Sequence, residues 1–89
     1  MTWEYRLRVG RDWAGMSGTY TKYRPNTLEK ARVIAAKILE HGDGDTYISV
    51  ERNGVSIGRV WGGTPYCEWI RFADHTRHQF DPRTGKMIK

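Results

Sequence analysis

The stretch "TYISVERNGVSIGRVW", residues 46–61, decides the fold of this protein. Its Asn53-Gly54 dipeptide lies between two runs in which apolar and polar residues alternate. The dipeptide favours a two-residue type I′ turn, because both of its positions tolerate a positive φ, and it therefore predicts a β-hairpin. A turn of this length predicts the opposed pairs Arg52 with Val55, Val50 with Ile57 and Ile48 with Arg59. The apolar face of the predicted hairpin consists of Ile48, Val50, Val55 and Ile57.

Further strands are predicted on both sides of this hairpin. "WEYRLRV" at residues 3–9 alternates strictly, which is typical of a half-buried strand whose polar face carries Arg6 and Arg8. "TYTKYR" at residues 19–24 is rich in β-branched and aromatic residues, and so is "PYCEWIRFA" at residues 65–73. Each of these two stretches therefore predicts one more strand.

A single helix is predicted between the second strand and the hairpin. In "PNTLEKARVIAAKILEHG", residues 25–42, apolar residues recur at helical spacing and form one stripe. Asn26 is the expected N-cap, because Glu29 follows it three residues later in the capping-box position. Gly42 is expected to end the helix, since glycine accepts the left-handed conformation found there.

The order of these elements predicts an α+β fold: a small antiparallel β-sheet of 4–6 strands, in the order ββ-α-ββ-β, with one helix packed on one face. A chain of 89 residues forms a single domain, residues 1–89. Residues 74–89 are polar and predict either a mobile tail or a terminal hairpin. Because one helix covers only part of one face, we expect the other face to be solvent-exposed, strongly curled or used by a partner.

The composition restricts the partners and the compartment. The net charge is +5, with 15 basic against 10 acidic residues, and this balance favours partners that carry phosphate or carboxylate. The single cysteine, Cys67, excludes an internal disulfide and favours a reducing compartment. The sequence predicts neither a signal peptide nor a membrane span, so we expect no membrane partner. The expected location is cytoplasmic, namely the host cytoplasm if the protein is phage-encoded.

A nucleic-acid interface is the first functional prediction. If Ile70 and Phe72 face the core, then Trp69 and Arg71 face outward on the sheet, as Arg6 does. Tryptophan beside arginines resembles a platform on which bases stack while the arginines hold phosphates. The alternative is that Trp69 is buried in a core. The predicted nucleic-acid-binding residues are Arg6, Arg8, Lys22, Arg24, Trp69 and Arg71.

A protein–protein module is the second functional prediction. Tryptophans are frequent anchors of protein interfaces, so Trp13, Trp61 and Trp69 are the candidate residues for a host protein partner. In this alternative the protein is an inhibitor or adaptor, or a homodimer that pairs exposed sheet faces or edges.

Catalytic and metal-binding functions are not expected. Structural zinc normally takes four ligands in paired short spacings, and Cys67 with His75 and His78 does not complete such a set. A Cys–His nucleophile also needs an orienting group and a concave site. The glycine-rich stretches lack the lysine and hydroxyl residue of a phosphate-binding loop. We therefore expect no enzymatic activity, no metal and no cofactor.

The first half of the chain resembles a known DNA-binding domain. The strand-strand-helix opening "YRLRV…GTYTKYRPNTLEKARVIAAKIL" is similar to the arm-type DNA-binding domain of phage integrases, in which a short sheet packs on one helix. The second half departs from this pattern by adding a hairpin and another strand. The short, basic, Trp- and Gly-rich chain also resembles small accessory proteins of actinobacterial phages. This second resemblance implies a protein that binds and redirects a host component.

Overall fold

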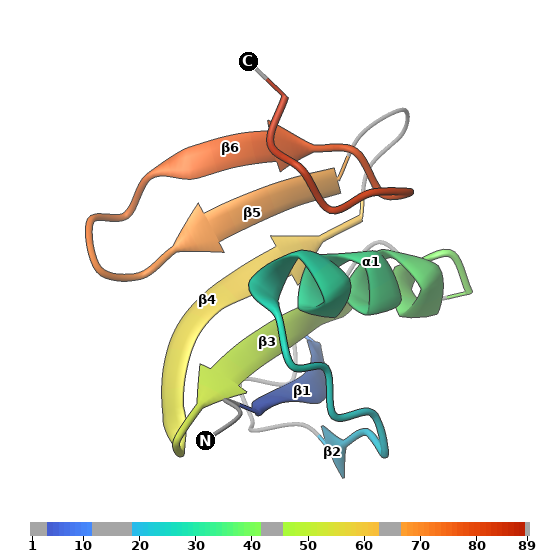
Figure 1. Cartoon of the computed structure of the whole chain (residues 1–89), viewed down its shortest axis with the longest axis vertical. Coiled ribbons are helices and arrows are strands. Elements are labelled where there is room, and N and C mark those ends of the chain that lie inside the picture. Colours follow the sequence, from blue (N-terminus) through green and yellow to red (C-terminus); the bar gives the residue numbers. More distant parts are fainter. Residues whose placement is uncertain (1–3, 12–18, 42–45, 63–66, 89) are drawn as a thin grey trace.

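The computed structural model describes residues 4–11, 19–41, 46–62 and 67–88. Within these residues one helix lies across a six-stranded antiparallel sheet (Figure 1). The elements are β1 (Tyr5–Arg11), β2 (Thr19–Tyr20), α1 (Leu28–Leu39), β3 (Thr46–Arg52), β4 (Val55–Trp61), β5 (Cys67–Arg71) and β6 (Arg77–Phe80). The strand order is β2-β1-β3-β4-β5-β6, and α1 packs against β1, β3 and β4. The predicted α+β architecture is confirmed.

The β3–β4 hairpin turns at the predicted dipeptide. Asn53 has a φ of 54° and Gly54 a φ of 78°, as a type I′ turn requires. Arg52 lies opposite Val55, so the first predicted pair is confirmed. Figure 1 shows β3 and β4 leaving this turn side by side, with β4 curving strongly along its length.

Beyond the first two residue pairs after the turn, a β-bulge shifts the register of this hairpin by one residue. The shift lies between Val50 and Glu51. The predicted pairs further along are therefore wrong, because Val50 faces Gly58 and not Ile57, and Ile48 faces Val60 and not Arg59. Since successive side chains point to opposite faces, one residue of shift exchanges the two faces. As a result Val60 is buried in the core together with residues of α1. Val55 keeps its predicted pairing with Arg52, and it is 62% exposed because it lies next to the turn.

Helix α1 begins one residue later than the predicted cap implies. Thr27 is the N-cap, and its Oγ1 accepts a hydrogen bond from the N–H of Lys30 at 3.1 Å. The prediction of Asn26 as the cap is wrong, because the threonine hydroxyl takes that role. Gly42, the expected helix end, lies outside the described residues. The buried side of α1 consists of Ala31, Arg32, Ala35, Ala36 and Leu39.

The second strand is shorter than predicted. Beyond Tyr20 the chain still bonds to β1, since the N–H of Thr21 donates to the Leu7 carbonyl at 2.8 Å. The Pro25 carbonyl accepts from the N–H of Tyr5 at 2.9 Å. Proline has no N–H of its own, so regular pairing does not continue through it. The predicted strand over residues 19–24 is therefore two residues of β2 followed by an irregular connection to α1.

Trp69 lies in the core and not on the outer surface. It is 3% exposed and pairs with Val60 across β4 and β5. The prediction that Ile70 and Phe72 form the core side of this strand is therefore wrong, and so is the outward placement of Trp69. The physical reason is the bulge, which turns Val60 toward α1. Trp69 lies opposite Val60 on β5, so its side chain points to the same face of the sheet.

Gly58 provides the space that the Trp69 ring occupies. A Cβ at Gly58 would collide with this ring and would lie 2.6 Å from the Ile70 carbonyl oxygen. A glycine inside a strand commonly marks a bulge or a close approach of another group, and Gly58 combines both.

The last described residues return along β5 and reach α1. Strand β6 is followed by a turn, and an isolated bridge pairs Phe80 with Met87. Gly85 has a φ of 75° and is buried against α1, where an added Cβ would collide with the Glu29 carbonyl. Its own carbonyl accepts a hydrogen bond from Nε of Arg32 at 2.7 Å. Residues 77–88 are thus a strand and a turn that pack on the helix.

Candidate functional site

The sheet face opposite α1 is the candidate functional surface, and we call it the open face. The pairing register assigns its side chains strand by strand. Within the described strands these residues are Arg6, Arg8, Tyr20, Tyr47, Ser49, Glu51, Ser56, Arg59, Trp61, Glu68, Ile70, Arg77 and Gln79. The open face is therefore a mixed aromatic and basic surface.

The first cluster on the open face is built around the Tyr20 ring. The guanidinium carbons of Arg6 and Arg8 lie 3.9 Å and 4.2 Å from the centre of this ring. The Tyr20 hydroxyl donates to Oε1 of Glu51 at 2.8 Å, and Oε2 of Glu51 lies 3.6 Å from Nε of Arg8. Glu51 is buried at 6% exposure, so its charge is held beneath the arginines and partly neutralises them.

The second cluster lies on the neighbouring strands β3 and β4. The guanidinium carbon of Arg59 lies 4.2 Å from the centre of the Tyr47 ring and 5.7 Å from that of Phe72. The Tyr47 and Trp61 rings pack with their centres 5.4 Å apart at an angle of 44°. Tilted aromatic pairs and guanidinium–ring contacts of this kind are favourable geometries. This cluster therefore presents a guanidinium plane and a half-buried tryptophan side by side.

Among the described residues, the open face carries more positive than negative charge. Its arginines are Arg6, Arg8, Arg59 and Arg77, and its carboxylates are Glu51 and Glu68. One carboxylate contacts Arg8, and the other lies 3.8 Å from Nε of Arg77. Nε of Arg6 is buried without a hydrogen-bond partner in the described structure. The surface thus combines an excess of guanidinium groups with aromatic rings.

The structure separates the six predicted nucleic-acid residues. Arg6 and Arg8 lie together on the open face. Lys22 and Arg24 are exposed in the connection to α1, where Arg24 pairs with Glu4 at 3.6 Å. The remaining two, Trp69 and Arg71, lie on the side of α1. Trp69 is buried there and does not belong to the open face.

Arg71 is exposed at the end of β5, on the same side as Trp69. Its NH1 nitrogen lies 3.7 Å from Oδ2 of Asp74. Hydrogen bonds from the Thr76 hydroxyl and N–H, followed by the charge of Arg71, hold the pKa of Asp74 below its usual value. Arg71 is therefore engaged at the β5–β6 turn and does not contribute to the open face.

The predicted tryptophan anchors have different environments. Trp61 is half-buried on the open face, next to Tyr47. Trp69 is a core residue, and Trp13 lies outside the described residues. The predicted partner site therefore reduces, in the described part of the chain, to Trp61.

Tyr20, Tyr47 and Arg59 belong to the open face but were not among the predicted site residues. Alternation along the strand sends Tyr47 to the face away from its buried neighbour Ile48, so the position of this tyrosine was predictable. Arg59 was not, because the simple hairpin register pairs it with Ile48 on the core side. The glycine at position 58 was the available signal for the bulge that moves Arg59 outward.

The residues considered for zinc or nucleophilic chemistry do not form one group. His78 lies on β6 opposite Trp69, two residue pairs along from the pair of Cys67 with Phe80. Cys67 is a buried thiol at the start of β5. His75 lies in the β5–β6 turn at the far end of that strand, with a φ of 57°. Within the described residues, no group of three or more His, Cys, Asp and Glu side chains is placed to hold a metal ion.

No helix in the described part of the chain is both long and apolar enough to cross a membrane. No family model, curated protein or solved structure matches the chain significantly. The resemblances to integrase arm-type domains and to phage accessory proteins therefore stay predictions.

Proposed function

We propose that this protein is a non-enzymatic binding module that binds single-stranded nucleic acid on its open face. The observation that carries this proposal is the stacking of arginine guanidinium groups on Tyr20 and Tyr47. Bases stack on aromatic rings and on guanidinium planes, and guanidinium groups donate paired hydrogen bonds to phosphates. A single strand, whose bases are not paired, offers both groups to one surface.

The arrangement of the two clusters supports an extended ligand. The first cluster lies over β2 and β1 and the second over β3 and β4, and β1 and β3 are neighbouring strands of the sheet. Strands are about 4.8 Å apart, so the clusters are separated by roughly 5–10 Å across the sheet. A short run of unpaired nucleotides spans that separation. Binding of this kind reads the backbone and the stacking faces and has little sequence preference.

The test is a titration of fluorescently labelled oligothymidylate and oligouridylate with the full chain. We expect affinity to fall steeply with salt, by about 0.7 logarithmic units per phosphate contact for each tenfold rise in salt concentration. The variant Arg59→Gln removes a charge and a stacking plane from the open face, and we expect it to weaken binding about fivefold or more.

Arg83→Gln is the matched control, because it removes the same charge from the turn after β6. The Arg83 side chain is 88% exposed and lies away from the open face. We expect this variant to change affinity by less than about twofold. Absence of binding at low salt, or equal losses in the two variants, would overturn the proposal.

The rival function is a protein–protein interface that uses the open face. The observation that favours it is the Trp61–Tyr47 pair, since tryptophan and tyrosine often anchor protein interfaces. Capture of partners from a host lysate after nuclease treatment separates the two functions. A partner that stays bound after nuclease and is lost from a Trp61→Ala variant supports the rival, whereas loss of every partner with nuclease supports nucleic acid.

A further inference from the structure

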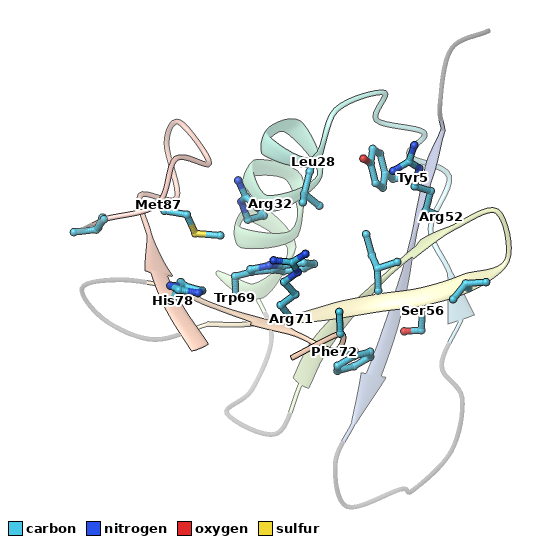
Figure 2. A pocket seen from close by; sticks show the side chains of 14 residues that line it. Tyr5, Leu28, Arg32, Arg52, Ser56, Trp69, Arg71, Phe72, His78 and Met87 are labelled. Carbon is cyan, nitrogen blue, oxygen red and sulfur yellow. The ribbon is translucent and has the colours of Figure 1, made fainter. Parts of the chain in front are cut away.

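A groove opens on the helix side of the sheet, opposite to the open face. Its volume is about 920 Å³, and it lies between the first turns of α1, the β5–β6 hairpin and the tip of the β3–β4 hairpin (Figure 2). Small-molecule sites have volumes of roughly 300–1,000 Å³ and mainly apolar walls. The apolar walls of this groove include Tyr5, Leu28, Ile57, Trp69, Met87 and Ile88.

The charged side chains that line the groove are all basic. They are Arg32 from α1, Arg52 from β3 and Arg71 from β5, with His78 from β6 beside them. No aspartate or glutamate lines the groove in the described structure. In the view of Figure 2, Arg32, Trp69 and Arg71 gather around the middle of the groove, whereas Arg52 lies at one end beside Tyr5. The groove therefore has an apolar wall and a cationic lining.

Arg32 is the unusual member of this set because it is buried at 6% exposure. Its Nε donates to the Gly85 carbonyl, and its guanidinium carbon lies 5.7 Å from the Trp69 ring and 5.9 Å from the Phe80 ring. No described carboxylate forms an ion pair with it. Burial lowers the pKa of Arg32, and the charge of Glu29 one turn earlier opposes that effect.

A buried cation without a carboxylate partner is costly, because the ring and carbonyl contacts replace only part of its hydration. A guanidinium group presents its donors in a fork that matches the two oxygens of a carboxylate. An anion in the groove would therefore supply the partner that the described residues do not. The adjacent apolar wall would bury the rest of such a molecule.

We infer that this groove binds a small amphipathic carboxylate, with its apolar body against Trp69 and Leu28 and its carboxylate on Arg32. Arg71, at the rim of the groove, is partly neutralised by Asp74, so the recognition of the anion rests on Arg32. The inference does not depend on the open face, which lies on the other side of the sheet. It holds whether or not the protein binds nucleic acid.

The probe is decanoate, compared with decanol and decylammonium, which have the same chain length but no charge or a positive charge. Each is titrated into the isotopically labelled full chain, and the indole N–H signal of Trp69 is followed by NMR. We expect decanoate to bind at least about tenfold more tightly than either analogue, because the alcohol and the amine lack the anionic group. Equal binding of the three would overturn the inference.

Arg32→Met removes the guanidinium directly, and we expect it to reduce decanoate affinity about tenfold. This variant also removes the hydrogen bond to Gly85. A second pair of variants therefore distinguishes the loss of the charge interaction from a loss of folding. Leu28→Glu places a carboxylate one helical turn before Arg32, whereas Leu28→Gln has nearly the same shape without the charge.

We expect Leu28→Glu to bind decanoate about tenfold more weakly than Leu28→Gln, because the new carboxylate pairs with Arg32 and repels the ligand. The NMR spectra of the unliganded variants report whether each is folded. Equal decanoate affinity in two folded Leu28 variants would overturn the inference.

Discussion

The absence of a side chain at Gly58 lets the Trp69 ring cross over β4 and reach the core. Two features follow from this single position. The indole forms a wall of the helix-side groove, and the bulge beside Gly58 sends Arg59 to the opposite face. Gly58 therefore lets the Trp69 ring lie on the groove side of the sheet while Arg59 lies on the open face.

Gly58→Ala is expected to destabilise the protein by about 1–3 kcal/mol, the usual cost of adding a methyl group to a packed core. The added Cβ would collide with the Trp69 ring and crowd the Ile70 carbonyl, which is part of the backbone and yields little. Urea unfolding followed by tryptophan fluorescence measures the free energy of unfolding. Gly62→Ala is the control, because the three atoms nearest to its Cβ all belong to the Leu39 side chain, the closest at 3.1 Å, and we expect a smaller loss. Equal losses at the two glycines would contradict this reasoning.

At the scale of the elements, the N-terminus of α1 gives a second test. Thr27 provides the cap hydrogen bond, whereas Asn26 is exposed and precedes it. Thr27→Ala is expected to lower the free energy of unfolding by about 1 kcal/mol, a typical value for losing an N-cap. Asn26→Ala is expected to change it by less than about 0.5 kcal/mol. A larger loss from the asparagine variant in the same denaturation experiment would show that the cap is assigned to the wrong residue.

Elements with a strong local signal were predictable from the sequence. The hairpin turn at Asn53-Gly54 follows from backbone chemistry at those two residues, and the helix follows from its apolar spacing. The register beyond the turn was not predictable from alternation, because a bulge depends on how Trp69 of a later strand packs on Gly58. Strand β6 was predicted only as one of two alternatives for residues 74–89, a mobile tail or a terminal hairpin, since three of its four side chains are exposed and give it no apolar pattern.

The residues of the candidate site were likewise predicted only in part. Arg6 and Arg8 were placed correctly by alternation with the buried Leu7. Arg59 and Trp69 were assigned to the wrong faces, because both assignments depended on pairing partners far away in the sequence. Local alternation gives the two faces of a strand, whereas the choice of which face meets the helix is made by tertiary packing.

At the scale of the whole molecule, the sheet separates two surfaces of different chemistry. The open face offers stacked guanidinium and aromatic groups over a broad area, as an extended anionic chain requires. The helix-side groove has mainly apolar walls, and its charged lining residues are all basic, one of them the buried Arg32. The described arginines therefore lie on both sides of the sheet and are not concentrated in one patch.

This separation predicts that the two ligands bind independently. Side chains of a sheet point to opposite faces, and at about 0.1 M salt charges more than about 10 Å apart in solvent are largely screened. Saturating decanoate is therefore expected to change the dissociation constant for oligothymidylate by less than about twofold, and by linkage the reverse effect has the same size. Both are measured by repeating each titration in the presence of the other ligand. Competition, seen as a change of about tenfold or more, would mean that both anions use one surface, and the Arg59→Gln and Leu28→Glu variants would then show which surface it is.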